Sequence, residues 1–173
     1  PICLSSLDKT VYPFELKLFL AEMQTLFDRG VRSFKFIDRT FNLKISTSIQ
    51  IMEFFLSKMQ TEKVYLHFEL VPDHLPEKLK STIEQFPEDS LQFEIGIQSL
   101  NPDIQDVISR KQDNEKVNNN LNWIRKNTQA HIHADLIIGL PGETIESFKR
   151  GFNQLVTMNP HEIQVGIPRD FPG

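Results

Sequence analysis

The sequence HIHADLIIGLPGE, from His131 to Glu143, is the clearest indication of fold class in this chain. Its first half alternates polar and apolar residues, which is typical of a β-strand with one buried face. Glycines then break the strand at Gly139 and Gly142, and Thr144 follows as the predicted N-cap of a helix. A strand that ends in a glycine turn and leads into a helix is either an ordinary β–α connection or the edge of a ligand site.

The composition is that of an ordinary folded domain. The chain has 173 residues, 39% hydrophobic and 24% charged, so we expect a single domain over residues 1–173. A net charge of −4 with scattered lysines and arginines argues against a nucleic-acid partner. No apolar run approaches the roughly 20 residues that span a bilayer, so no membrane is expected. The single cysteine excludes an internal disulfide and favours a reducing, cytoplasmic setting.

The same strand-then-helix pattern recurs along the whole chain. Segments with apolar residues at helical spacing separate short runs with strand periodicity. The predicted strands are residues 33–37, 64–71, 91–97, a strand from residue 131, and 162–167. Each unit of strand, helix and strand has about the length of a βαβ crossover. The pattern therefore predicts a parallel sheet with right-handed connections.

Every predicted strand has one apolar and one polar face. A doubly wound sheet is covered by helices on both sides, and its strands are apolar throughout. A curved sheet with helices outside and a polar concave side, as in part of a barrel, fits these strands better. The polar side chains that would share this side are Lys35, His67, Glu69, Glu94, Gln98, His133, Asp135 and Gln164. Each could be a solvated residue, but ionisable groups buried together need partners or a ligand.

Three motifs, in order, resemble the radical S-adenosylmethionine (SAM) superfamily. They are FEIGIQSLN from Phe93 to Asn101, ISRK from Ile108 to Lys111, and DLIIGLPGE from Asp135. The resemblance covers nearly the whole chain. It is strongest to the cobalamin-linked branch, which includes anaerobic magnesium-protoporphyrin ester cyclases, and to the oxygen-independent coproporphyrinogen dehydrogenases. It implies an α/β fold, a partial and open (β/α)6-type, TIM-like barrel of parallel strands, with the first strand and the cluster loop largely missing.

Cys3 is the candidate metal ligand. In the family, a CxxxCxxC motif holds a 4Fe-4S cluster, for which thiolates are suitable ligands. The resemblance places the third cysteine of that motif at Cys3, one helix before the predicted strand 33–37. The chain begins at Pro1 without a methionine, so we expect the other two cysteines upstream, in a longer protein of which this is a core fragment. The fragment alone would then be inactive. The alternative is a lone incidental cysteine.

The resemblance also implies contacts to SAM from the strand ends. Backbone carbonyls near Asp38 to Thr40 correspond to the segment that contacts the methionine amino group, although the family usually has a glycine-rich turn there. Glu69 resembles a carboxylate that contacts the amino group or the ribose. Gln98 and Asp135 resemble residues that lie at the ribose.

Two further SAM contacts are implied after the strands. Arg110 resembles the arginine that pairs with the methionine carboxylate, a charge-assisted contact that suits a guanidinium. The turn from Gly139 to Gly142 would let the backbone approach the adenine. The alternatives are a solvated cation at a helix end for Arg110 and turn geometry alone for the two glycines.

These assignments imply the core of a radical SAM oxidoreductase or methyltransferase-type enzyme with a small-molecule substrate. The reduced cluster would cleave SAM to methionine and a 5′-deoxyadenosyl radical, with electrons from a donor such as flavodoxin or ferredoxin. The segments CLSS and FIDRTF also imply an upstream cobalamin-binding domain.

Two alternatives stay open. One is a cluster-free (β/α)-barrel aldolase or isomerase that uses Glu69, His67, His133 and Asp135 for acid–base chemistry. The other is a non-catalytic interaction module.

Overall fold

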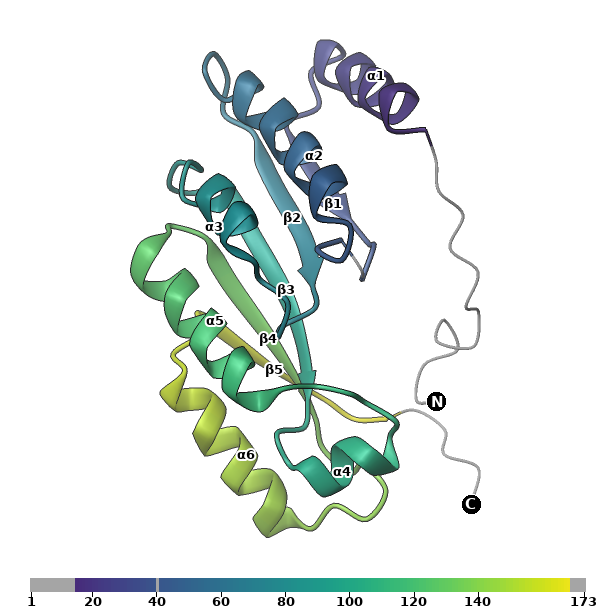
Figure 1. The fold of residues 1–173 in the computed structure, drawn as a ribbon, viewed down its shortest axis with the longest axis vertical. Helices are drawn as coiled ribbons and strands as arrows, with labels where there is room; N and C mark the ends of the chain where they lie inside the picture. Colours follow the sequence, from purple (N-terminus) through teal and green to yellow (C-terminus); the bar gives the residue numbers. More distant parts are fainter. Residues whose placement is uncertain (1–14, 40, 169–173) are drawn as a thin grey trace.

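Helices and strands alternate along the chain, as the periodicity predicts. The computed structural model describes residues 15–39 and 41–168. In chain order they form α1 (Leu16–Asp28), β1 (Ser33–Phe36), α2 (Ile45–Lys58), β2 (Tyr65–Leu70), α3 (Glu77–Ile83), β3 (Leu91–Gln98), α4 (Pro102–Val107), α5 (Asn114–Asn127), β4 (His131–Ile137), α6 (Ile145–Thr157) and β5 (Glu162–Gly166), as Figure 1 shows. All of the predicted strands are therefore present, with small differences at their ends.

The strands form one parallel sheet. Its order follows the sequence, β1-β2-β3-β4-β5, and every neighbouring pair is parallel. Over the described residues β1 and β5 do not pair with each other, so the sheet is open. The predicted α/β class with an open parallel sheet is confirmed. In such a sheet the carboxyl ends of all strands lie along one edge, where ligands commonly bind.

The core lies between the apolar face of the sheet and the helices. Figure 1 shows α2, α3, α5 and α6 along one face. In β2, β3 and β4 every second residue is buried and the residues between them are half-buried. An aromatic stack closes the β1 side of the core, where the Phe68 ring centroid lies 4.5 Å from that of Phe36 and 4.0 Å from that of Phe41. The predicted apolar faces are thus the ones that pack under the helices.

The last strand departs from this pattern. The alternation places Val165 and Ile167 on the apolar face, yet their exposed fractions are 42% and 78%. Ile163 does pack against the core. In a β/α order each strand is covered by the helices before and after it. Only α6 is available to cover β5, because the described part of the chain contains no helix after this strand.

The predicted N-cap of α6 is present, and α4 has one as well. Thr144 accepts a hydrogen bond from the Ser147 backbone N–H at 3.2 Å at the start of α6. Asn101 accepts one from the Asp103 N–H at 2.9 Å at the start of α4. The segment from His131 therefore folds as predicted, into a strand, a glycine turn and a capped helix.

Throughout residues 15–39 and 41–168, every helix is too short or too polar to cross a bilayer.

Candidate cofactor-binding site

A cavity of about 250 Å³ lies at the carboxyl edge of β2, β3 and β4. Among the predicted site residues, Glu69, Gln98, Arg110 and Asp135 line it, together with Gly96. Glu69 comes from the end of β2, Gln98 from the end of β3 and Asp135 from β4. Parallel strands place these residues at the same edge, although they are far apart in the sequence.

The end of β3 is distorted at Gln98. The Gln98 backbone lies in the left-handed region, with φ of +65°, and the pairing with β4 shifts register between Gly96 and Gln98. Residues other than glycine rarely adopt this conformation, and bulges next to binding sites re-aim side chains. Gln98 therefore lines the cavity from a strained position that no local sequence pattern indicates.

Arg110 lies between α4 and α5 and is anchored to β3. Its Nη2 donates a hydrogen bond to the Gly96 carbonyl, and its Nε donates to Gln112 Oε1 at 2.9 Å. Burial lowers the pKa of Arg110, while the charge of Asp73 acts in the opposite direction. Arg110 is thus an anchored and largely desolvated cation, and not a solvated one at a helix end.

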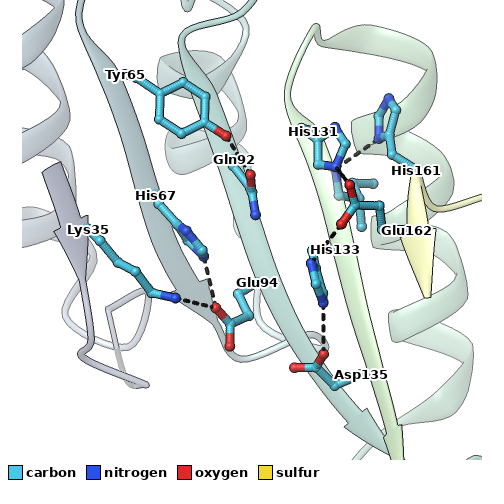
Figure 2. Close-up of polar contacts among 11 residues, drawn as sticks. Lys35, Tyr65, His67, Gln92, Glu94, His131, His133, Asp135, His161 and Glu162 are labelled. Atoms are coloured by element: carbon cyan, nitrogen blue, oxygen red, sulfur yellow. Dashed lines mark hydrogen bonds and ion pairs between the residues drawn. The ribbon is translucent and has the colours of Figure 1, made fainter. Parts of the chain in front are cut away.

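Lys35, Glu94 and His67 form an ionic cluster on the same polar face, drawn in Figure 2. Lys35 Nζ donates to Glu94 Oε2 at 3.0 Å. His67 Nε2 lies 2.9 Å from that oxygen, within ion-pair distance but without hydrogen-bond alignment. Burial acts to raise the pKa of Glu94, but the hydrogen bond and charge of Lys35 outweigh it, so the pKa is lowered. Burial and the charge of Lys35 lower the pKa of His67. The cluster therefore favours an ionised Glu94 and a neutral His67.

Asp135 belongs to a row of carboxyl and imidazole groups on β4 and β5. His133 Nε2 lies 3.2 Å from Asp135 Oδ1, and His133 Nδ1 lies 3.1 Å from Glu162 Oε2 (Figure 2). Asp135 Oδ1 is buried, and no described residue donates an aligned hydrogen bond to it. Burial raises the pKa of Asp135, and the charge of His133 opposes this shift. Asp135 therefore presents a desolvated oxygen that lacks a donor, at the wall of the cavity.

Glu69 adds a second desolvated carboxyl. Its Oε2 lies 3.7 Å from Arg39 Nε, and its Cα is paired with that of Glu94 across β2 and β3. Burial raises the pKa of Glu69 and the Glu94 carboxylate raises it further, against the charges of Arg39 and Lys35. Because Glu69 and Asp135 both line the cavity, a cation beside these two carboxyls would be favoured over an anion.

Of the other predicted SAM contacts that the structure describes, Asp38, Gly139 and Gly142 do not line the cavity. Asp38 is exposed just after β1. Gly139 and Gly142 have φ of +85° and +78°, so their backbone conformations favour glycine whether or not a ligand is near. Cys3 and Thr40 lie outside the described residues. Within the described ranges, no group of three or more His, Cys, Asp and Glu side chains could hold a metal ion. The roles of these residues stay predictions.

Gly96 is a cavity residue that the sequence analysis did not single out. It pairs with Asp135 across β3 and β4, and a Cβ added to it would meet no atom within 4 Å. Its carbonyl is the one that anchors Arg110. The available signal was a glycine inside a strand at a polar-face position, because such a glycine often marks a close approach of a ligand or another chain segment.

A comparison with protein families identifies the superfamily. Residues 5–155 of this sequence match the family described as the Radical SAM superfamily. The chain belongs to this superfamily. Radical SAM proteins use a 4Fe-4S cluster and SAM. Membership favours the radical SAM prediction over the cluster-free aldolase or isomerase and over the non-catalytic module.

Curated relatives of this radical SAM chain match only part of it. The oxygen-independent coproporphyrinogen III oxidase of Escherichia coli (strain K12) is 34% identical over 71 residues, which are 41% of this chain and 16% of that enzyme. The ribosomal protein uS12 methylthiotransferase RimO of Clostridioides difficile (strain 630) is 31% identical over 80 residues, which are 46% of this chain and 18% of that enzyme. The chain therefore spans less than a quarter of the length of these relatives.

Solved structures share the fold. The radical SAM methyltransferase TsrM from Kitasatospora setae superimposes with a TM-score of 0.75 at 16% identity, over 91% of this chain and 32% of that one. Coproporphyrinogen III oxidase (HemN) from Escherichia coli gives 0.68 at 19% identity, over 91% and 36%. At these identities the likeness concerns the fold alone. Because these neighbours are TIM-barrel-like, the predicted barrel-type architecture is confirmed.

Proposed function

We propose that this chain is the core of a radical SAM enzyme and that the cavity at the carboxyl edge binds SAM. The observation that carries the proposal is the convergence of one anchored arginine, Arg110, and two desolvated carboxyls, Glu69 and Asp135, on one cavity. SAM carries a carboxylate, an ammonium, a sulfonium and ribose hydroxyls, so it offers each of these groups a complementary partner. Membership of the superfamily supports the same ligand.

Each cavity residue is proposed to bind a different group of SAM. Arg110 pairs with the methionine carboxylate, since its Nη2 and Nε are already used by protein acceptors and no described residue accepts a hydrogen bond from Nη1. Glu69 accepts from the methionine ammonium. A ribose hydroxyl supplies the donor that Asp135 Oδ1 lacks, and Gln98 binds the neighbouring hydroxyl. The Asp38 carbonyl and the turn at residues 139–142 are the proposed contacts to the amino group and the adenine.

Cys3 is the proposed thiolate ligand that this chain contributes to the 4Fe-4S cluster. It is the single cysteine of the chain, so the remaining ligands come from other parts of the full-length protein. When bound, the cluster supplies the electron that splits SAM into methionine and a 5′-deoxyadenosyl radical for hydrogen abstraction from the substrate. The residues of this chain bind and orient SAM.

The reaction is proposed to be an oxidation or a methyl transfer on a small molecule. Matching relatives include an oxidase, and the TsrM structure is that of a methyltransferase with cobalamin and a cluster bound. We therefore propose an upstream cobalamin domain and a flavodoxin- or ferredoxin-type electron donor, with no nucleic acid or membrane partner. A cytoplasmic location would keep the cluster thiols reduced.

The test uses the full-length protein, reconstituted anaerobically with iron and sulfide. We expect cluster absorbance, SAM binding by calorimetry, and 5′-deoxyadenosine on reduction. Arg110→Gln should weaken SAM binding by roughly 10- to 100-fold, because it removes a charge-assisted hydrogen bond. Lys126→Gln, which neutralises an exposed cation in the last turn of α5, is the control and should bind SAM normally. A protein with neither cluster nor SAM binding would contradict the proposal.

A further inference from the structure

We propose that Gln105, on α4, is a positioning residue that presents Arg110 to SAM through a connected set of side-chain amides. The inference rests on the proposed function, because it concerns how the arginine is held for its ligand. Gln105 is only 4% exposed, and it belongs to a helix of 6 residues. A buried amide is unfavourable unless its polar atoms are bonded, so its hydrogen bonds indicate what it holds in place.

Gln105 is connected to the Arg110 guanidinium by hydrogen bonds. Its Nε2 donates to the Ser99 carbonyl at 2.8 Å and to Asn114 Oδ1 at 2.7 Å. Gln112 Nε2 donates to the same Asn114 oxygen at 3.1 Å, and Gln112 Oε1 accepts from Arg110 Nε at 2.9 Å. The connection therefore runs from the end of β3, through three side-chain amides, to the guanidinium.

The backbone of Gln105 holds the same arginine. The Arg110 N–H donates to the Gln105 carbonyl at 2.8 Å. Ser109 lies in the left-handed region with φ of +57°, so the chain turns sharply just before Arg110. The turn brings the guanidinium to the Gly96 carbonyl, which accepts from Nη2. Arg110 is therefore fixed to β3 at one nitrogen directly and at another through Gln105.

The amide connection matters because an arginine side chain is long and flexible. Ordering this side chain when the ligand binds costs conformational entropy and weakens the affinity, whereas a preorganised guanidinium is already ordered before the ligand binds. Without the Gln105 amide, the Ser99 carbonyl and Asn114 Oδ1 lose a buried donor. Among the described residues, the Asn114 side chain is then held only by its bond to the Leu100 carbonyl and by Gln112, so the orientation of Gln112 beside Arg110 is less firmly fixed. The affinity for a carboxylate then falls, although no atom of Gln105 touches it.

The test compares two ligands on the reconstituted full-length protein. Gln105→Leu keeps a side chain of similar size and removes the amide. We expect the Kd for SAM to rise about tenfold, as for the loss of support to one charged hydrogen bond. The Kd for decarboxylated SAM should not change, because that ligand has no carboxylate for Arg110. A merely structural defect would weaken both ligands alike.

A second variant protects the test against a folding defect. Gln112→Ala breaks the same connection in the half-buried loop between α4 and α5 and should give the same selective loss. Thr82→Val is the control. It removes the hydroxyl of Thr82, which is 5% exposed on α3, and should leave both Kd values unchanged.

Three outcomes separate this inference from the proposed function. Equal weakening of both ligands in Gln105→Leu and Gln112→Ala would overturn the positioning role. So would unchanged SAM binding in both variants while Arg110→Gln loses affinity, and in that case the proposed function would stand. Absence of SAM binding by the unmutated protein would overturn the proposed function and this inference with it.

Discussion

Asp135 and Glu94 are carboxyls on neighbouring strands whose pKa values shift in opposite directions. Burial raises the pKa of Asp135 against the opposing charge of His133. Separately, its Oδ1 has no aligned donor among the described residues. Burial acts in the same direction on Glu94, but Lys35 reverses it through a hydrogen bond and its charge. The difference matters because a carboxyl that lacks a donor favours a ligand with hydroxyls, whereas a paired one is already satisfied.

Asp135→Asn should make the protein more stable than the wild type at neutral pH. Because the folded-state pKa is raised above 3.8, the folded protein holds its proton more tightly than the unfolded chain does. The contribution of Asp135 to the stability of the wild type then falls as the pH rises from 3.8 through the raised pKa. The advantage of Asp135→Asn should therefore vanish toward pH 3.8 in urea denaturation series. Superimposable pH profiles of the two proteins would contradict this.

Glu94→Gln should have the opposite effect. The folded-state pKa is lowered from 4.5, so the carboxylate contributes stability that is present above pH 4.5 and is lost as the pH falls through the folded value. The variant should be less stable than the wild type at neutral pH. The same urea series measures this, and a stabilised Glu94→Gln would show that Lys35 does not compensate for its burial.

Gly96→Leu should fill the cavity without unfolding the chain. A Cβ there meets no atom within 4 Å, and the backbone is not in the left-handed region. We expect the Kd for SAM to rise by more than about tenfold, with a smaller rise for Gly96→Ala and little change in the thermal midpoint. Gly151→Ala adds a methyl on α6, at an ordinary 3.8 Å from Leu100, and should bind SAM normally. Normal binding by Gly96→Leu would place SAM elsewhere.

Among the elements, α6 shows the clearest link between a sequence signal and a structure. The glycine turn ends β4, and Thr144 then caps the helix by accepting from the Ser147 N–H. Ser147 Oγ in turn accepts from Asn101 Nδ2 at 2.7 Å, which connects the start of α6 to the start of α4. The cap therefore stabilises the helix and fixes it beside the connection that follows β3.

Thr144→Ala should destabilise the domain by about 1 kcal/mol, because an N-cap hydrogen bond is lost. Urea denaturation monitored by circular dichroism measures the change. Thr157→Ala, at the other end of α6, removes an exposed hydroxyl that bonds the Gln154 carbonyl at 2.6 Å, and it should have a smaller effect. Equal effects of the two substitutions would show that the loss of any threonine in α6 matters as much as the loss of the cap.

Two features at element ends had no signal in the sequence. The register shift before Gln98 depends on how β3 pairs with β4. The left-handed backbone of Ser109 lies in the turn that ends α4, where the Arg110 N–H donates to the Gln105 carbonyl, and a serine replaces the glycine that usually marks this position. Helical and strand periods report which face of an element is buried, and they contain no information on such local irregularities.

On the scale of the whole molecule, the sheet and its helices are held together by a core rich in phenylalanine. Phe68 is fully buried at the centre of the aromatic stack formed with Phe36 and Phe41. Its loss would open a cavity between β1, β2 and the segment that leads to α2. The cost of such a cavity adds to the lost transfer free energy.

Phe68→Ala should therefore reduce the free energy of unfolding by about 3–5 kcal/mol. Leu18→Ala is the control, because Leu18 is 61% exposed on α1, and a change within roughly 0.5 kcal/mol is expected there. Both values come from denaturant titrations of the same protein preparation. A small effect of Phe68→Ala would mean that the aromatic stack can rearrange to fill the space.

The order of elements, the parallel sheet and its buried face follow from the sequence, since alternation along each strand and the length of each crossover are local properties. The same reasoning brought Glu69, Gln98 and Asp135 to one edge, and the resemblance added Arg110. The anchoring of Arg110 by Gly96, Gln112 and Gln105, the missing donor at Asp135 and the covering of β5 became visible only in three dimensions. Each of them depends on contacts between residues from different elements, and no local pattern encodes those distances.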